Sequence, residues 1–92
     1  MRGVEARVLF VVEITEYERG RGQRPEGYLA FLNESAADNH IADEYKDRVG
    51  SAPDVYWNYS KVGYKEASAE SISKVKKAKN KRIYVDKIDQ LK

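Results

Sequence analysis

The chain has 92 residues, which is enough for one domain and leaves no room for a second hydrophobic core. Hydrophobic residues make up 41% of it and aromatic residues 11%, which excludes a disordered chain, and the lack of cysteine excludes disulfides and thiolate metal sites. The net charge of +2 divides into −4 over residues 1–60 (seven basic, eleven acidic) and +6 over residues 61–92 (ten basic, four acidic), so contact with a polyanion is expected only on the C-terminal side.

The first apolar run, Val8 to Val12, is too short for a signal sequence or a membrane span, and Glu13 ends it. We therefore expect a soluble, cytoplasmic protein that does not bind membranes, in keeping with its lack of cysteine. The run continues to Tyr17 as a strand that is apolar on both sides at its start, which predicts a central position in the sheet.

A long loop is expected next, from Glu18 to Gly27, because three glycines and a proline fall within ten residues. Tyr28 to Leu32 then returns as the second strand. Asn33 or Ser35 can cap the helix that follows. Its buried stripe is predicted as Ala37, Ile41, Ala42, Tyr45 and Val49, and its end as Gly50 to Pro53.

The second half of the chain repeats a strand and a helix. Val55 to Val62 predicts a strand rich in aromatic residues, with Gly63 at a bulge or at its end. Ser68 caps a predicted second helix that runs to Lys79, with Asn80 as its C-cap. Its core residues are expected to be Ile72, Val75 and Ala78. A final strand is expected from Arg82 to Ile88.

The order ββαβαβ predicts a single α+β domain over residues 1–92, with a sheet of three or four strands and two helices packed on one face. The short connections permit a parallel or an antiparallel C-terminal strand, so its direction stays open.

The loop from Glu18 to Gly27 is the most distinctive candidate site, because it places three arginines on a glycine-rich backbone. Guanidinium groups bind phosphate or carboxylate with two parallel hydrogen bonds, and glycines let backbone N–H groups converge on an anion. It is no P-loop, since the Gly-Lys-Ser/Thr sequence is absent. The alternative is a solvated loop whose arginines pair with nearby glutamates. The candidate residues are Arg19, Arg21, Gln23, Arg24 and Tyr28.

The lysine-rich second helix is a candidate for nucleic-acid contact, because several cations at helical spacing can follow a row of phosphates. The candidate residues are Lys74, Lys77, Lys81 and Arg82. A solvated helix face is the interpretation we favour, since a net charge of +2 is low for a dedicated nucleic-acid binder. Trp57 and Tyr59 are expected in the core, with Tyr56 and Tyr64 pointing outward near Lys61 and Lys65, where they could contact a ligand.

His40 has Asp43 and Glu44 at helical spacing, an arrangement that can imitate an acid–base pair or a metal site. We favour a solvent-facing array of ion pairs, because no second histidine exists to complete a catalytic group. The sequence therefore predicts no catalytic residue, no metal site and no cofactor, and the protein is not expected to be an enzyme.

Two short segments carry a resemblance. The run YERGRGQRPEGY at residues 17–28, and GYKEAS at residues 63–68 before the lysine-rich helix, resemble segments of small uncharacterised proteins of bacteriophages and prophages. The resemblance implies an origin in a phage or mobile element, where small non-catalytic binders of host proteins or signalling nucleotides are common. It transfers no functional residue.

The sequence thus favours a small non-catalytic binding protein that engages a host protein or an anionic, phosphorylated small molecule through the arginine loop. The alternative is a nucleic-acid-binding module that uses the second helix together with exposed tyrosines.

Overall fold

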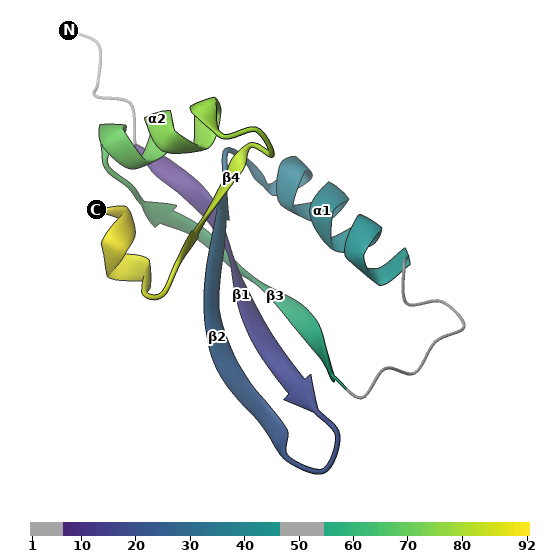
Figure 1. Ribbon diagram of the computed structural model, residues 1–92. Coiled ribbons are helices and arrows are strands. Elements are labelled where there is room, and N and C mark those ends of the chain that lie inside the picture. The colour runs from purple at the N-terminus through teal and green to yellow at the C-terminus, as the bar shows by residue number, and fades with distance from the viewer. Residues whose placement is uncertain (1–6, 47–54) are drawn as a thin grey trace, which may run out of the picture.

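The computed structural model describes residues 7–46 and 55–92, and for Val55 and Tyr56 the backbone alone. The chain forms one small α+β domain with the predicted order ββαβαβ (Figure 1). Its elements are β1 (Val8–Glu18), β2 (Gly22–Phe31), α1 (Glu34–Lys46), β3 (Val55–Glu66), α2 (Ala69–Lys77), β4 (Arg82–Val85) and a short 3-10 helix, η1 (Ile88–Leu91).

The four strands form one sheet in the order β3-β1-β2-β4, and every neighbouring pair is antiparallel. The central position predicted for the first strand is confirmed, since β1 pairs with β2 on one side and with β3 on the other. The direction of the last strand, which the sequence left open, is antiparallel to β2.

The prediction that both helices pack on one face of the sheet is wrong, because α1 covers one face while α2 and η1 cover the other (Figure 1). Successive β1 side chains point to opposite faces. Leu9 and Val11 belong to a core cluster with Val75 of α2, whereas Phe10 belongs to a second cluster with Ala37 of α1. A strand that is apolar on both sides thus supplies two thin cores.

The predicted N-caps are confirmed at both helices. The Asn33 side-chain oxygen accepts a hydrogen bond from the Ala36 N–H at 2.9 Å, and the Ser68 hydroxyl accepts one from the Ser71 N–H at 3.1 Å. The predicted end of the second helix is wrong: α2 stops at Lys77, with Ala78 instead of Asn80 as its C-cap. The predicted end of the first helix, with Val49, lies outside the described residues.

The predicted loop from Glu18 to Gly27 is also wrong. β1 continues to Glu18 and β2 begins at Gly22, so the turn itself holds three residues. A bulge absorbs the irregular sequence, because Ile14 pairs with Gly27 and the next residue pairs with Pro25, leaving Glu26 as the extra residue. Proline is tolerated there because β4 pairs with β2 from Tyr28 onward, so Pro25 lies at an edge position.

The other strand ends also differ from the prediction. β3 extends through Gly63 to Glu66, with a bulge where Val11 and Val12 pair with Gly63 and Lys61. β4 is shorter than predicted and ends at Val85. The chain turns there because the Gln90 side chain accepts the Asp86 N–H, and η1 then places Leu91 in the core under α2.

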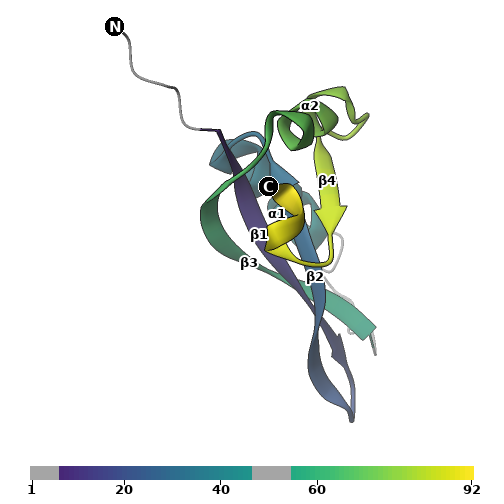
Figure 2. The ribbon, with the colours of Figure 1, turned by 90° about the vertical axis from the view of Figure 1, so that its left-hand side faces the viewer.

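The described molecule is elongated, with extents of 56 × 23 × 20 Å. Both helices lie toward one end of the strands, and the β1–β2 hairpin continues well past them (Figure 2). β3 pairs with β1 to the last residue of β1. We call this projecting three-stranded part the arm. It consists of residues 14–27, including the turn, and 55–59.

Candidate binding surface on the arm

The tip of the arm carries the predicted arginine site, now as a tight turn. The Arg21 N–H donates to the Glu18 carbonyl at 3.0 Å, and Gly20 and Gly22 both have φ of +84°, which favours glycine. Residues 19–25 are all exposed. The turn therefore displays Arg19 and Arg21 at the end of the molecule, away from both cores.

Arg24 forms the best-defined polar contact of the arm. Its Nε and Nη2 atoms both donate to Oε1 of Glu16, at 3.0 and 2.8 Å, from the neighbouring strand. The hydrogen bond with Glu16 and the carboxylate charge raise the pKa of Arg24. Arg21 pairs more loosely with Glu18 at 3.8 Å. The guanidinium groups of Arg24 and Arg21 thus already face a carboxylate.

The structure separates the other two predicted site residues from Arg24. Gln23 pairs with Tyr17 and therefore points to the opposite face from Arg24, which pairs with Glu16. Tyr28 is half-buried and packs against the core cluster under α2. It is a packing residue and does not form a stacking surface with the arginines.

A second feature lies on the α1 face of the sheet, beyond the described residues of α1. Ile14, Glu26, Trp57, Tyr59 and Tyr84 line an open hollow of about 280 Å³, which we call the aromatic hollow. Trp57 is 44% exposed and Tyr84 is 51% exposed. The prediction that Trp57 belongs to the core is therefore wrong. Trp57 lies on the same face as the core residues Phe10 and Val12, but farther along the sheet than the described residues of α1.

Tyr84 is held in place over Gly27. Its hydroxyl group donates to the Glu26 carbonyl or to the Asp86 carboxylate, whose Oδ1 atom lies 3.0 Å away. A Cβ atom at Gly27 would lie 2.5 Å from the Tyr84 hydroxyl oxygen, so the ring rests directly on the glycine. The hydrogen bond to Asp86 raises the pKa of Tyr84. Sequence alternation along β4 could have indicated Tyr84 as outward-facing, but not its contact with Gly27.

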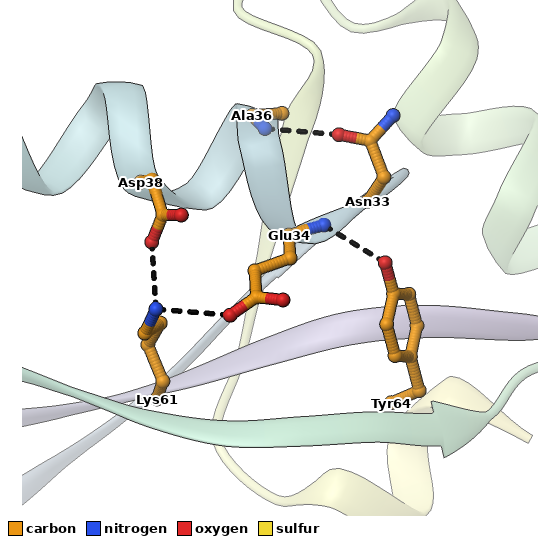
Figure 3. A network of polar contacts seen from close by, with 6 residues as sticks. All are labelled: Asn33, Glu34, Ala36, Asp38, Lys61 and Tyr64. Carbon is orange, nitrogen blue, oxygen red and sulfur yellow. Dashed lines mark hydrogen bonds and ion pairs between the residues drawn. The ribbon is translucent and has the colours of Figure 1, made fainter.

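Tyr64, predicted to point outward where it could contact a ligand, and the nearby Lys61 instead fasten α1 to β3 (Figure 3). The Tyr64 hydroxyl accepts the Glu34 N–H at 3.0 Å, and its ring meets Phe10 edge-on at 4.9 Å between centroids. Lys61 Nζ lies 2.9 Å from both Glu34 and Asp38. These contacts hold the first turns of α1 over the sheet. The side chain of Tyr56 lies outside the description.

The prediction that His40 belongs to a solvent-facing array of ion pairs is wrong. Its ring lies between Phe31 and Tyr59, with centroids 5.7 and 5.5 Å away. Burial, followed by the positive charge of Arg82, lowers the pKa of His40. Glu44 accepts a hydrogen bond from the Tyr59 hydroxyl at 2.6 Å. In residues 7–46 and 55–92, no three His, Asp or Glu side chains gather as a metal site would require.

The four candidates for nucleic-acid contact do not form one stripe. Lys74 and Lys77 are exposed on α2, but the helix ends there. Lys81 has φ of 58°, and its ammonium group donates to the Lys76 carbonyl at the end of α2. Arg82 pairs with Phe31 on the opposite face of the sheet, near His40.

Comparison with known proteins finds no matching family model, no matching curated protein and no matching solved structure. None of the helices in the described ranges is both long and apolar enough to cross a membrane.

Proposed function

We propose that this is a small non-catalytic binding protein that engages a partner protein through the tip of the arm. The observation that carries the proposal is the arm itself. It projects past both helices (Figure 1), and its end displays Arg19, Arg21, Gln23 and Arg24.

The tip of the arm adds little to the stability of the domain. Buried hydrophobic residues of β1 end at Ile14, and residues 19–25 of the hairpin are exposed. A tight turn placed nearer the helices would close the same sheet with fewer residues to order. Protruding loops and hairpins that do not serve the core are frequent sites of function.

A protein partner is favoured over a phosphorylated small molecule by the charges at the tip. Arg24 and Arg21 face Glu16 and Glu18, and a hollow of about 200 Å³ beside them is lined by both glutamates. These carboxylates repel a phosphate and occupy the guanidinium groups that would bind it. At a protein interface, by contrast, arginine is enriched among the residues that contribute most binding energy.

Nucleic-acid binding has less support, since α2 supplies exposed lysines whereas Lys81 and Arg82 point elsewhere. The resemblance to bacteriophage and prophage proteins makes a host protein in the bacterial cytoplasm the proposed partner. Origin and compartment are part of this proposal.

The test compares two variants by cross-linking and affinity capture from cells that encode the protein. The triple variant Arg19→Ala/Arg21→Ala/Arg24→Ala removes the guanidinium groups of the tip. Because exposed ion pairs contribute under about 1 kcal/mol each, its melting temperature should fall by only a few degrees. Partners captured by the wild type should be lost.

The matched control, Lys74→Ala/Lys77→Ala, changes two exposed cations on α2 and should capture the same partners as the wild type. A photo-cross-linking amino acid in place of Gln23 should join the partner covalently. If the triple variant folds and retains every partner, the binding surface lies elsewhere. If it unfolds, the arginines are structural.

A further inference from the structure

We propose that the aromatic hollow binds an organic cation, specifically an alkylated ammonium group such as a trimethylammonium. Three aromatic side chains and one carboxylate gather there: Trp57 and Tyr59 from β3, Tyr84 from β4 and Glu26 from the bulge of β2. Ile14 of β1 supplies the apolar base. Ammonium ions are attracted to the faces of aromatic rings, and sites built from several rings are the known means of recognising quaternary ammonium groups.

The hydrogen bonds of the two tyrosines make their rings better cation binders. Tyr59 donates to the carboxylate of Glu44 at 2.6 Å, and Tyr84 donates to the Glu26 carbonyl or to Asp86. A phenol that donates to an anion or a carbonyl gains electron density on its ring. The negative face of each ring is thereby strengthened, which favours a cation over a neutral apolar group.

The charges around the hollow have the sign that this ligand requires. Glu26 lines the hollow. Glu44 accepts a hydrogen bond from the Tyr59 hydroxyl, and the Asp86 carboxylate lies within hydrogen-bond distance of the Tyr84 hydroxyl. Two arginines also lie on this face: Arg24 of β2 is bound to Glu16, and Arg82 of β4 lies near His40 and does not line the hollow. A phosphate or carboxylate ligand would be repelled here, and an uncharged ligand would gain nothing from the carboxylates.

Two of the aromatic walls of the hollow, Tyr84 and Tyr59, are held by packing before a ligand arrives, which reduces the ordering that binding requires. Tyr84 rests on Gly27, and the Tyr59 ring is packed edge-on against His40 at 5.5 Å and Tyr45 at 6.2 Å. Trp57, the only tryptophan of the chain, is free to report binding through its fluorescence because it is 44% exposed. The hollow can hold the cation whether or not the arginine tip binds a protein.

The experiment titrates the full chain with choline and with 3,3-dimethyl-1-butanol, its uncharged isostere, while Trp57 fluorescence is recorded. Choline should bind saturably and about tenfold more tightly than the isostere, because a desolvated cation–π contact raises the affinity by about tenfold or more. A peptide that carries trimethyllysine is the second arm. Tighter binding of the peptide identifies a protein side chain as the source, whereas equal binding identifies a small molecule.

Two variants test the site. Glu26→Gln keeps the shape and should weaken choline severalfold without changing the affinity for the isostere. Trp57→Ala should abolish choline binding, which isothermal calorimetry measures because this variant has no tryptophan fluorescence. The tip variant Arg19→Ala/Arg21→Ala should bind choline like the wild type. The proposal is overturned if choline and its isostere bind equally, if Glu26→Gln weakens both alike, or if choline shows no saturable binding at about 10 mM.

Discussion

Gly27 is the position at which one added methyl group tests the contact beneath the aromatic hollow. Its φ of +150° is unfavourable for any residue with a Cβ atom, and that atom would lie 2.5 Å from the Tyr84 oxygen and 2.6 Å from a ring carbon. Gly27→Ala therefore combines backbone strain of about 1–3 kcal/mol with the displacement of Tyr84 and loss of its hydrogen bond, about 1 kcal/mol. We expect the free energy of unfolding to fall by about 2–4 kcal/mol.

Two controls separate these contributions in urea denaturation. Gly20→Ala meets no atom within 4 Å and has φ of +84°, so it should show backbone strain alone, about 1 kcal/mol. In a Tyr84→Ala background the clash is gone, so the cost of Gly27→Ala should fall by about 1 kcal/mol, which is the coupling energy between the two positions. If Gly27→Ala is equally destabilising with and without the tyrosine ring, Tyr84 does not rest on Gly27 and the wall of the hollow is misplaced.

Other variants test the cores, a cap, the histidine and the basic helix. Phe10→Ala should cost about 3–5 kcal/mol in urea denaturation because Phe10 is 4% exposed, and a melting temperature near that of the wild type would contradict this. Ser68→Ala should cost about 0.5–2 kcal/mol through loss of the N-cap of α2, measured in the same assay. Because folding lowers the pKa of His40, the folded state binds fewer protons than the unfolded state. The contribution of His40 to the free energy of unfolding is therefore fully present above pH about 6.5 and is lost as the pH falls below it. Denaturation measured across this pH range should show a flatter dependence for His40→Gln. Fluorescence anisotropy with DNA or RNA should show weak binding that disappears at 150 mM salt, and a submicromolar complex at that salt would favour Lys74 and Lys77 as a nucleic-acid site.

Local signals predicted the elements of this fold more reliably than their lengths. The caps Asn33 and Ser68 were predictable because a side-chain oxygen before a helix satisfies N–H groups of its first turn. The glycines and proline between Glu18 and Gly27 were misinterpreted as a loop. They permit a turn and a bulge as readily. The choice depends on how this segment pairs with β1 and on how β1 in turn pairs with β3, which is a long-range property.

The placement of the helices could have been inferred from one strand. Leu9 and Val11 lie on one side of β1, and Phe10 and Val12 lie on the other, and each side needs a cover. A central strand that is apolar on both faces is incompatible with two helices on the same face. The apolar residues on both faces of β1 therefore predict one helix on each face, whereas the prediction of a single core placed both helices together.

The aromatic hollow follows from the unequal reach of helices and strands. At about 1.5 Å per residue, the 13 residues of α1 span about 20 Å, whereas the 11 residues of β1 span about 36 Å at about 3.3 Å each. The described part of α1 therefore reaches along about half the length of β1. Side chains with core-like spacing continue along the strands past these residues. Trp57 has the spacing of a core residue and the exposure of a surface residue, and the length mismatch accounts for both.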